Sequence, residues 1–159
     1  MGAKGEALAK QFEAKVQEAT AVLGKLSAAD WKKTTAAEEW TVGVTAHHIA
    51  GAYEPVAHII KTIATGQALP HFTPAMLDEM NAKHAEEHAS CTKAETTALH
   101  QKGAATAAAV VRDLSDEQLA RSGTVFAGLP PMSAEQLVMR GLINHIDEHF
   151  GSIRKTIGG

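Results

Sequence analysis

The sequence lacks the features that identify several common classes of protein. It contains a single cysteine, Cys91, so no disulfide can form within the chain, and a reducing compartment suits it. It has no excess of basic residues, since 15 Lys and Arg stand against 18 Asp and Glu and the net charge is −3. The lysines are also scattered, whereas nucleic-acid binding needs a concentrated positive field. We therefore expect no nucleic-acid partner.

Long apolar segments are absent as well. Residues 1–6 contain no apolar core of a signal peptide, and Glu6 stands where a myristoylation signal needs Ser or Thr. No later segment approaches the roughly 20 consecutive apolar residues that a membrane span requires. We therefore expect a cytoplasmic protein without membrane contact.

What the chain does contain is typical of one globular domain over residues 1–159, with 45% hydrophobic and 21% charged residues. Four segments show apolar residues at helical spacings of three and four, and they cover about 3–24, 41–64, 92–113 and 133–156. Each is some 20 residues long, or about 30 Å, which matches a compact four-helix bundle. No segment alternates as a strand would, so the predicted fold is all-α.

The connections are longer than an up-down bundle needs. The longest runs from 65 to 91 and contains Thr73-Pro74, a helix-start signal, so we expect an extra helix from there through Ala89. A crossover of this length can join two parallel neighbouring helices. Capping patterns at 27–30 and 115–118 predict single helical turns inside two further connections.

Three histidines are the most informative residues of the chain. His48 interrupts an apolar stripe along the segment 41–64, and His145 and His149 lie four residues apart in the last helical segment. Residues four apart lie one above the other on a helix, so this pair can reach a common point. The stripe that His48 interrupts consists of Val44, Ala52, Val56, Ile59 and Ile63.

A divalent cation would satisfy these three side chains together. A buried imidazole needs a partner for each ring nitrogen, and one cation can satisfy one nitrogen on each of three histidines. Three neutral ligands with an open position are typical of a catalytic metal site rather than a structural one. The other interpretation is that His145 and His149 are solvated or hydrogen-bonded helix histidines, because a chain with nine histidines readily contains such pairs by chance.

A second pair with the same spacing, His84 and His88, illustrates that point. Together with Asn81, these residues either cover the open side of the three-histidine site and contact substrate, or lie on the surface of the extra helix. No general acid or base is evident. Asp147 and Glu148 lie between the two C-terminal histidines in sequence, but their helical positions direct them away from the ligand face.

Packing explains the other conspicuous residues. Cys91 is expected to be a small buried hydrophobe, and Trp31 and Trp40 are expected to be packing anchors at the mouth of the bundle. Alanine-rich helices that expose Val and Ile can pair along an outer face, so the sequence is compatible with a homodimer and equally with a monomer.

Several motifs of the chain occur together in one known family. The segment 40–50 begins Trp-Thr-Val and ends His-Ile-Ala, follows the run Leu-Ser-Ala-Ala-Asp-Trp at 26–31, and is matched near the C-terminus by an H-x-x-x-H motif. With these motifs the chain resembles the DinB-like superfamily of metal-binding four-helix bundles over nearly its whole length, from the first helix to Ile157. Members include the mycothiol-dependent maleylpyruvate isomerases and the bacillithiol S-transferases.

The resemblance implies a set of metal ligands. The family pattern uses one histidine on the second helix and two on the fourth, which implies His48, His145 and His149 here. His47 occupies a position where the family usually has a small or variable residue, so the ligand is assigned to its neighbour. The chain departs from the pattern at Gly43-Val44, where many members carry a polar or acidic residue, and this departure predicts a less firmly started second helix.

The resemblance also implies a function. A divalent metal at this site, expected to be zinc, with nickel or iron also suited to imidazole, would activate a low-molecular-weight thiol for S-transfer or isomerisation. With water in place of the thiol, the same site would be that of a hydrolase. The expected partner is therefore a small-molecule substrate or thiol. The alternative function is a non-catalytic metal- or ligand-binding module of a stress response.

Overall fold

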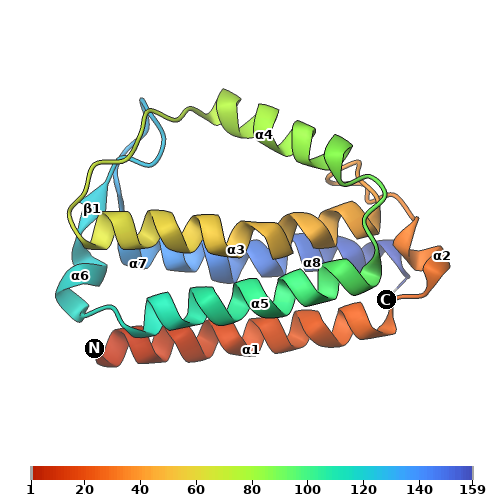
Figure 1. The fold of residues 1–159 in the computed structure, drawn as a ribbon, viewed down its shortest axis with the longest axis horizontal. Coiled ribbons are helices and arrows are strands. Elements are labelled where there is room, and N and C mark those ends of the chain that lie inside the picture. Colours follow the sequence, from red (N-terminus) through yellow and green to blue (C-terminus); the bar gives the residue numbers. More distant parts are fainter. Residues whose placement is uncertain (1, 159) are drawn as a thin grey trace.

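The computed structural model describes residues 2–158, and in this range the regular secondary structure is helical apart from two strands of two residues each. Four long helical rods lie side by side (Figure 1). They are α1 (Ala3–Lys25), α3 (Val42–Ala64), α5 (Lys93–Arg112), and a last rod made of α7 (Ala134–Leu137), η1 (Val138–Ile143) and α8 (Asn144–Thr156). Both α1 and α3 contact α5 on one side and α8 on the other. The all-α prediction is confirmed.

Short elements fill the connections between the rods. They are α2 (Ala28–Trp31), α4 (Pro74–Glu87), α6 (Asp116–Ala120), and the antiparallel strands β1 (Ser122–Gly123) and β2 (Met132–Ser133). The sequence predicted all of them except the strands, and α4 ends two residues earlier than expected. In Figure 1, α3 and α5 run in the same direction. The helix α4, which lies between them in the sequence, runs back on the side of α3 away from α5. None of the helices in residues 2–158 combines the length and apolar character that crossing a bilayer requires.

Local side-chain caps explain where the long helices begin. The side chains of Thr41, Thr92 and Ser133 accept hydrogen bonds from backbone N–H groups three residues later, at 3.0–3.1 Å. Such a cap contributes about 1 kcal/mol to helix stability. The helix α3 therefore begins at a capped residue, Thr41, although its first turn contains no acidic residue.

Gly43 has a packing role at this start. A Cβ atom on Gly43 would collide with the indole ring of Trp31. Since the Trp31 Nε1–H also donates to the carbonyl of Cys91 at 2.9 Å, the indole is held on both sides. The departure from the family pattern at Gly43 therefore makes room for Trp31, which confirms Trp31 as a packing anchor.

The buried face of α3 differs from the predicted stripe. The fully buried side chains include Ile49, Tyr53, Ala57 and Ile60, whereas the predicted Ala52, Val56 and Ile59 are only half-buried. The reason is that α3 packs against α5 on one side and α8 on the other. A helix covered on two sides has a wide apolar face, so a single period in the sequence does not locate its centre.

The last rod is not one regular α-helix as predicted, because Val138–Ile143 forms a π-helical segment. A π-helix closes its hydrogen bonds from i to i+5, so each of its turns takes up more residues than an α-turn. Accordingly, buried residues of this rod recur every four positions at Val138, Leu142, Ile146 and Phe150. His145 and His149 are half-buried and lie beside this stripe rather than within it.

Candidate metal centre

The structure brings together the three histidines that the family resemblance implied. His48 lies in the first half of α3, and His145 and His149 lie in the first half of α8. The ring centroid of His48 is 5.1 Å from that of His145 and 5.0 Å from that of His149, and the latter two are 4.7 Å apart. One nitrogen from each ring lies within 4.8 Å of the other two. The rings therefore converge on one point.

The spacing and charge of these rings fit a divalent cation. The Nε2 atoms of His48 and His145 face each other at 3.3 Å. Two nitrogen ligands of a tetrahedral zinc ion, each at about 2.0–2.1 Å, lie about 3.3 Å apart. Burial, reinforced by the neighbouring rings, lowers the pKa of His48 to about 3 and that of His145 to about 4. Both rings are therefore neutral at pH 7, and each has a lone pair to offer.

A carboxylate lies behind the third ring. The Nδ1–H of His149 donates to Oε2 of Glu38 at 2.6 Å, and these side chains are only 12% and 7% exposed. Burial alone would raise the pKa of Glu38, but hydrogen bonds with His149, Thr35 and Ser152 together outweigh it and the pKa is lowered. A proton on Nδ1 leaves Nε2 of His149 as the free lone pair. Metal-ligating histidines commonly show this carboxylate–histidine arrangement.

A tight loop before α3 positions Glu38. The backbone N–H of Thr35 donates to the carbonyl of Trp40 at 2.8 Å, and Thr34 and Thr41 form an isolated bridge. Glu39 has φ 60°, a left-handed conformation that is uncommon outside glycine. This turn leaves Glu39 exposed and directs Glu38 inward.

Sequence reasoning missed Glu38. Two adjacent glutamates occur in this loop, and no periodicity shows which of them points inward, because the loop is not helical. The one available signal was an acidic pair beside a Trp-Thr helix start, which is too common to identify a site.

The remaining predicted residues lie as follows. Asp147 is exposed and pairs with Lys15 at 3.1 Å, and Glu148 is also exposed, so both point away from the histidines as predicted. Trp40 packs its ring against that of His48, with centroids 5.2 Å apart. Cys91 is half-buried rather than fully buried, and burial raises the pKa of its thiol, which does not favour a nucleophile.

The sequence left open whether α4 covers the site or only decorates the surface. His84 reaches the centre, because its ring is edge-on to that of His48 with centroids 5.8 Å apart. Its Nε2 lies 2.8 Å from Nδ1 of His47, and His88 stacks on His47 with centroids 4.1 Å apart. Asn81 is half-buried on the same helix. The structure thus places His84 against the candidate metal centre.

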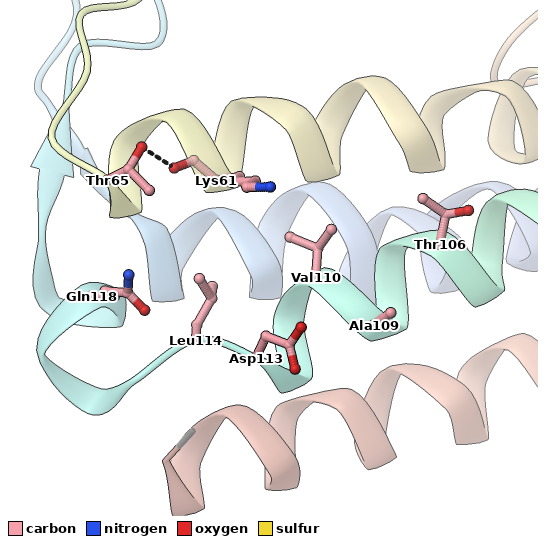
Figure 2. A pocket seen from close by; sticks show the side chains of 8 residues that line it. All are labelled: Lys61, Thr65, Thr106, Ala109, Val110, Asp113, Leu114 and Gln118. Atoms are coloured by element: carbon pink, nitrogen blue, oxygen red, sulfur yellow. Dashed lines mark hydrogen bonds between the residues drawn. The ribbon is translucent and has the colours of Figure 1, made fainter.

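A surface pocket of about 450 Å³ lies elsewhere (Figure 2). Its lining includes Lys61 and Thr65 at the end of α3 and Asp113 just after α5. The histidines lie near the opposite end of α3, so this pocket is not part of the candidate centre. The candidate centre is therefore defined by its three donor nitrogens and not by a cavity.

Comparisons with known proteins agree with this architecture. The family model of the mycothiol maleylpyruvate isomerase N-terminal domain matches residues 12–143. A crystal structure of the mycothiol-dependent maleylpyruvate isomerase superposes with a TM-score of 0.72 at 17% identity, covering 94% of this chain and 60% of that one. A histidine-to-alanine mutant of that enzyme superposes with a TM-score of 0.68 at 17% identity, covering 96% and 65%.

The chain thus spans 60% and 65% of the length of these two solved proteins. At this level of identity, the superpositions show the shared fold alone. A search of curated protein sequences finds no significant match.

Proposed function

We propose a function for this chain on the premise that it belongs to the mycothiol maleylpyruvate isomerase N-terminal domain family, a DinB-like family. The chain binds one divalent cation through His48, His145 and His149 and uses this centre to activate a low-molecular-weight thiol. The thiol is either transferred to an electrophile or assists an isomerisation. The convergence of three imidazoles from α3 and α8 is the observation that carries the proposal.

Each residue of the centre has a defined task in this proposal. His48 and His145 offer Nε2 lone pairs from opposite helices at the separation that a tetrahedral cation needs. Glu38 keeps the proton of His149 on Nδ1 and fixes the orientation of its ring. The ring of Trp40 lies against His48 and restricts its rotation. These residues hold the donor set in place before a ligand arrives.

A divalent cation held by these residues would supply the chemistry at this site. Because three neutral imidazoles leave its double charge uncompensated, a thiol bound beside it would lose its proton and become a nucleophile. Imidazole ligands suit zinc, nickel and ferrous iron, and we propose zinc because the donor separation agrees with its tetrahedral geometry.

The proposal of a thiol as the substrate is supported by the name of the family and by the similar solved structures. The similar solved protein is described as dependent on mycothiol and acting on maleylpyruvate. We extend only the thiol class to this chain, because the chain spans 60% of that protein and the identity is 17%. The small-molecule partner is therefore a thiol, and the electrophile is the unknown to be screened. The cytoplasmic location stays a prediction from the sequence, which is compatible with a homodimer and with a monomer alike.

The test combines metal analysis with a thiol screen. Protein without a histidine tag is purified, its metal content is measured, and it is assayed with mycothiol, bacillithiol and glutathione against maleylpyruvate and model electrophiles. The His145→Ala variant serves as the inactive control. His58→Ala, which alters an exposed histidine on the same helix as His48, serves as the matched control. Bound metal with thiol-dependent turnover that His145→Ala alone abolishes would support the proposal.

The second candidate function is a non-catalytic metal-binding module. It is favoured by the direction of two carboxylates. Asp147 and Glu148 lie next to the ligands in sequence, but both are exposed and directed away from the centre, so neither can act there as a general acid or base. This function predicts that metal removal lowers the melting temperature while no thiol gives turnover above His145→Ala. Such a result would replace the enzyme proposal and leave metal binding in place.

A further inference from the structure

We propose that His47, His84 and His88 form a second divalent-cation site, which fastens α4 onto α3. One nitrogen from each of these rings lies within 4.8 Å of the other two. His47 comes from α3 and is 8% exposed, while His84 is on α4 and His88 is its C-cap residue. The site shares no ligand with the first centre, although His84 also lies against His48, and it does not depend on the proposed function.

The three rings of the cluster are close together but are not yet arranged as a ligand set. Nδ1 of His47 and Nε2 of His84 are 2.8 Å apart, so in the absence of a cation one of them donates to the other. The rings of His47 and His88 stack with an angle of 22° between their planes, so their lone pairs lie in nearly parallel planes and do not meet at an atom between the two rings. Cation binding therefore requires the His88 ring to turn toward the other two. His88 is the C-cap residue of α4, so this turn does not require a change inside the helix.

One atom of the cluster lacks a partner. Nδ1 of His84 is buried, and no hydrogen-bond partner for it occurs among residues 2–158. A buried imidazole nitrogen without a partner is unfavourable, since it has lost water and gained nothing in exchange. Crowding three imidazoles together increases this cost, unless something that accepts several lone pairs at once lies between them. A divalent cation has that property.

The way in which α4 is held points in the same direction. None of the 14 residues of α4 is fully buried, and its Met76 and Met80 are 40% and 56% exposed. Its N-terminal approach is anchored by the backbone N–H of Ala127, which donates to the carbonyl of Phe72 at 2.7 Å. Hydrophobic burial therefore holds α4 weakly along its length. The histidine cluster is the polar contact that joins its C-terminal half to α3.

The donor set selects the class of cation. Three imidazole nitrogens suit zinc, nickel, cobalt and copper, whereas magnesium and calcium require oxygen ligands. Glu95 and Glu87 place negative charge near His47 and His84 respectively, although burial dominates and lowers the pKa of both rings. No carboxylate backs this cluster in the way that Glu38 backs His149, among the residues that the structure describes. We therefore expect the second site to bind more weakly than the first.

The experiment counts bound cations in four forms of the full-length, untagged protein. Metal-stripped protein is titrated with Zn²⁺ by calorimetry, and bound zinc is measured after gel filtration. Wild type is expected to bind two equivalents. The double variant His84→Ala/His88→Ala is expected to bind one, tight, equivalent. The double variant His145→Ala/His149→Ala is expected to bind one, weak, equivalent.

The matched control alters two histidines outside both clusters. His58→Ala/His71→Ala removes the same number of imidazoles from exposed positions and should still bind two equivalents. Circular dichroism checks the helical content of each variant. If His84→Ala/His88→Ala does not fold, the single change His88→Asn, at the exposed end of α4, takes its place and should weaken the second equivalent by more than about 10-fold.

A second measurement reports on α4 itself. Hydrogen exchange across residues 74–87 should slow when Zn²⁺ is added to wild type or to His145→Ala/His149→Ala, and should not change in His84→Ala/His88→Ala. Failure of the first centre alone would leave this protection intact, so the two proposals are tested separately. A single equivalent in wild type that is lost in His145→Ala/His149→Ala would overturn the second site, as would a second equivalent that persists without His84 and His88.

Discussion

His100 and His48 are both covered by the bundle, but their imidazoles have opposite surroundings. His100 is fully buried, its Nδ1 lies 3.1 Å from the Tyr53 hydroxyl, and its Nε2 lies 3.1 Å from the Thr20 hydroxyl. Each ring nitrogen of His100 therefore has a hydroxyl group of the protein as its partner. Nε2 of His48 instead faces Nε2 of His145. A structural histidine such as His100 thus has a hydrogen-bond partner within the protein for each ring nitrogen, whereas we propose that His48 finds its partner in a bound cation.

The two histidine clusters extend this comparison. In the first cluster, Glu38 accepts a hydrogen bond from Nδ1–H of His149 and fixes which nitrogen is free. In the second, His47 and His84 bond to each other and Nδ1 of His84 has no partner among residues 2–158. The first cluster is therefore prepared for a cation, and the second must rearrange to bind one. Affinity should follow that order.

The largest effect should come from removing a ligand of the first cluster. We expect His145→Ala to weaken cation binding at this centre by more than the 10- to 100-fold that loss of a supporting residue causes. Competition against a chromophoric chelator measures the Kd. The same change at His58 should leave the Kd unaltered. An unchanged Kd in His145→Ala would remove the distinction between His100 and the clustered histidines.

Next in size is the loss of the supporting carboxylate. Glu38→Gln keeps the shape of the side chain but removes the charge that orders His149, so cation affinity should fall by about 10- to 100-fold. Glu39→Gln is the matched control, since Glu39 is the exposed neighbour in the same loop. Equal effects of the two changes would show that general charge, and not the Glu38–His149 hydrogen bond, acts on the cation.

A change at His100 should affect stability and leave metal binding alone. His100→Leu leaves the buried hydroxyl of Tyr53 without its partner, which should lower the free energy of unfolding by about 1–3 kcal/mol. Urea denaturation of metal-stripped protein measures this change, and the chelator assay should give the wild-type Kd. A loss of cation affinity comparable to that of Glu38→Gln would contradict the structural role.

The pH dependence of stability should also separate His100 from exposed histidines. Burial lowers the pKa of His100 below its usual 6.5, so the folded state resists its protonation while the unfolded state accepts the proton. Stability is then unaffected above about pH 6.5, and falls below it by up to about 1.4 kcal/mol per pH unit for this one group. The difference between wild type and His100→Leu isolates this slope in urea titrations from pH 7.5 to 5. Parallel curves would argue against a neutral, buried His100.

The smallest effect is expected at Asp147, which lies between two proposed ligands in sequence but is exposed and paired with Lys15. Asp147→Asn should change the Kd for the cation by less than about 2-fold, because exposed ion pairs contribute little. The chelator assay serves here as well. A large effect would mean that sequence proximity outweighs side-chain direction at this centre.

Local signals in the sequence predicted most of the fold. A cap such as Thr41 or Ser133 acts on a backbone N–H three residues away, so its effect can be identified without knowing the tertiary structure. The His145–His149 pair is local in the same sense, because helical spacing alone makes the two rings neighbours. The π-helical segment and the true buried face of α3 were missed, because both depend on how neighbouring helices pack.

The sequence by itself determined the helices, their starts and the pairing of His145 with His149, because each of these depends on residues within about one turn of one another. The family resemblance had already grouped His48 with His145 and His149, but only the tertiary structure placed His47 beside His84 and His88. Consecutive residues of a helix point about 100° apart, so His48 meets α8 while His47 meets α4. Which helix occupies each direction depends on the packing of the whole bundle, and so does the placement of Glu38 behind His149.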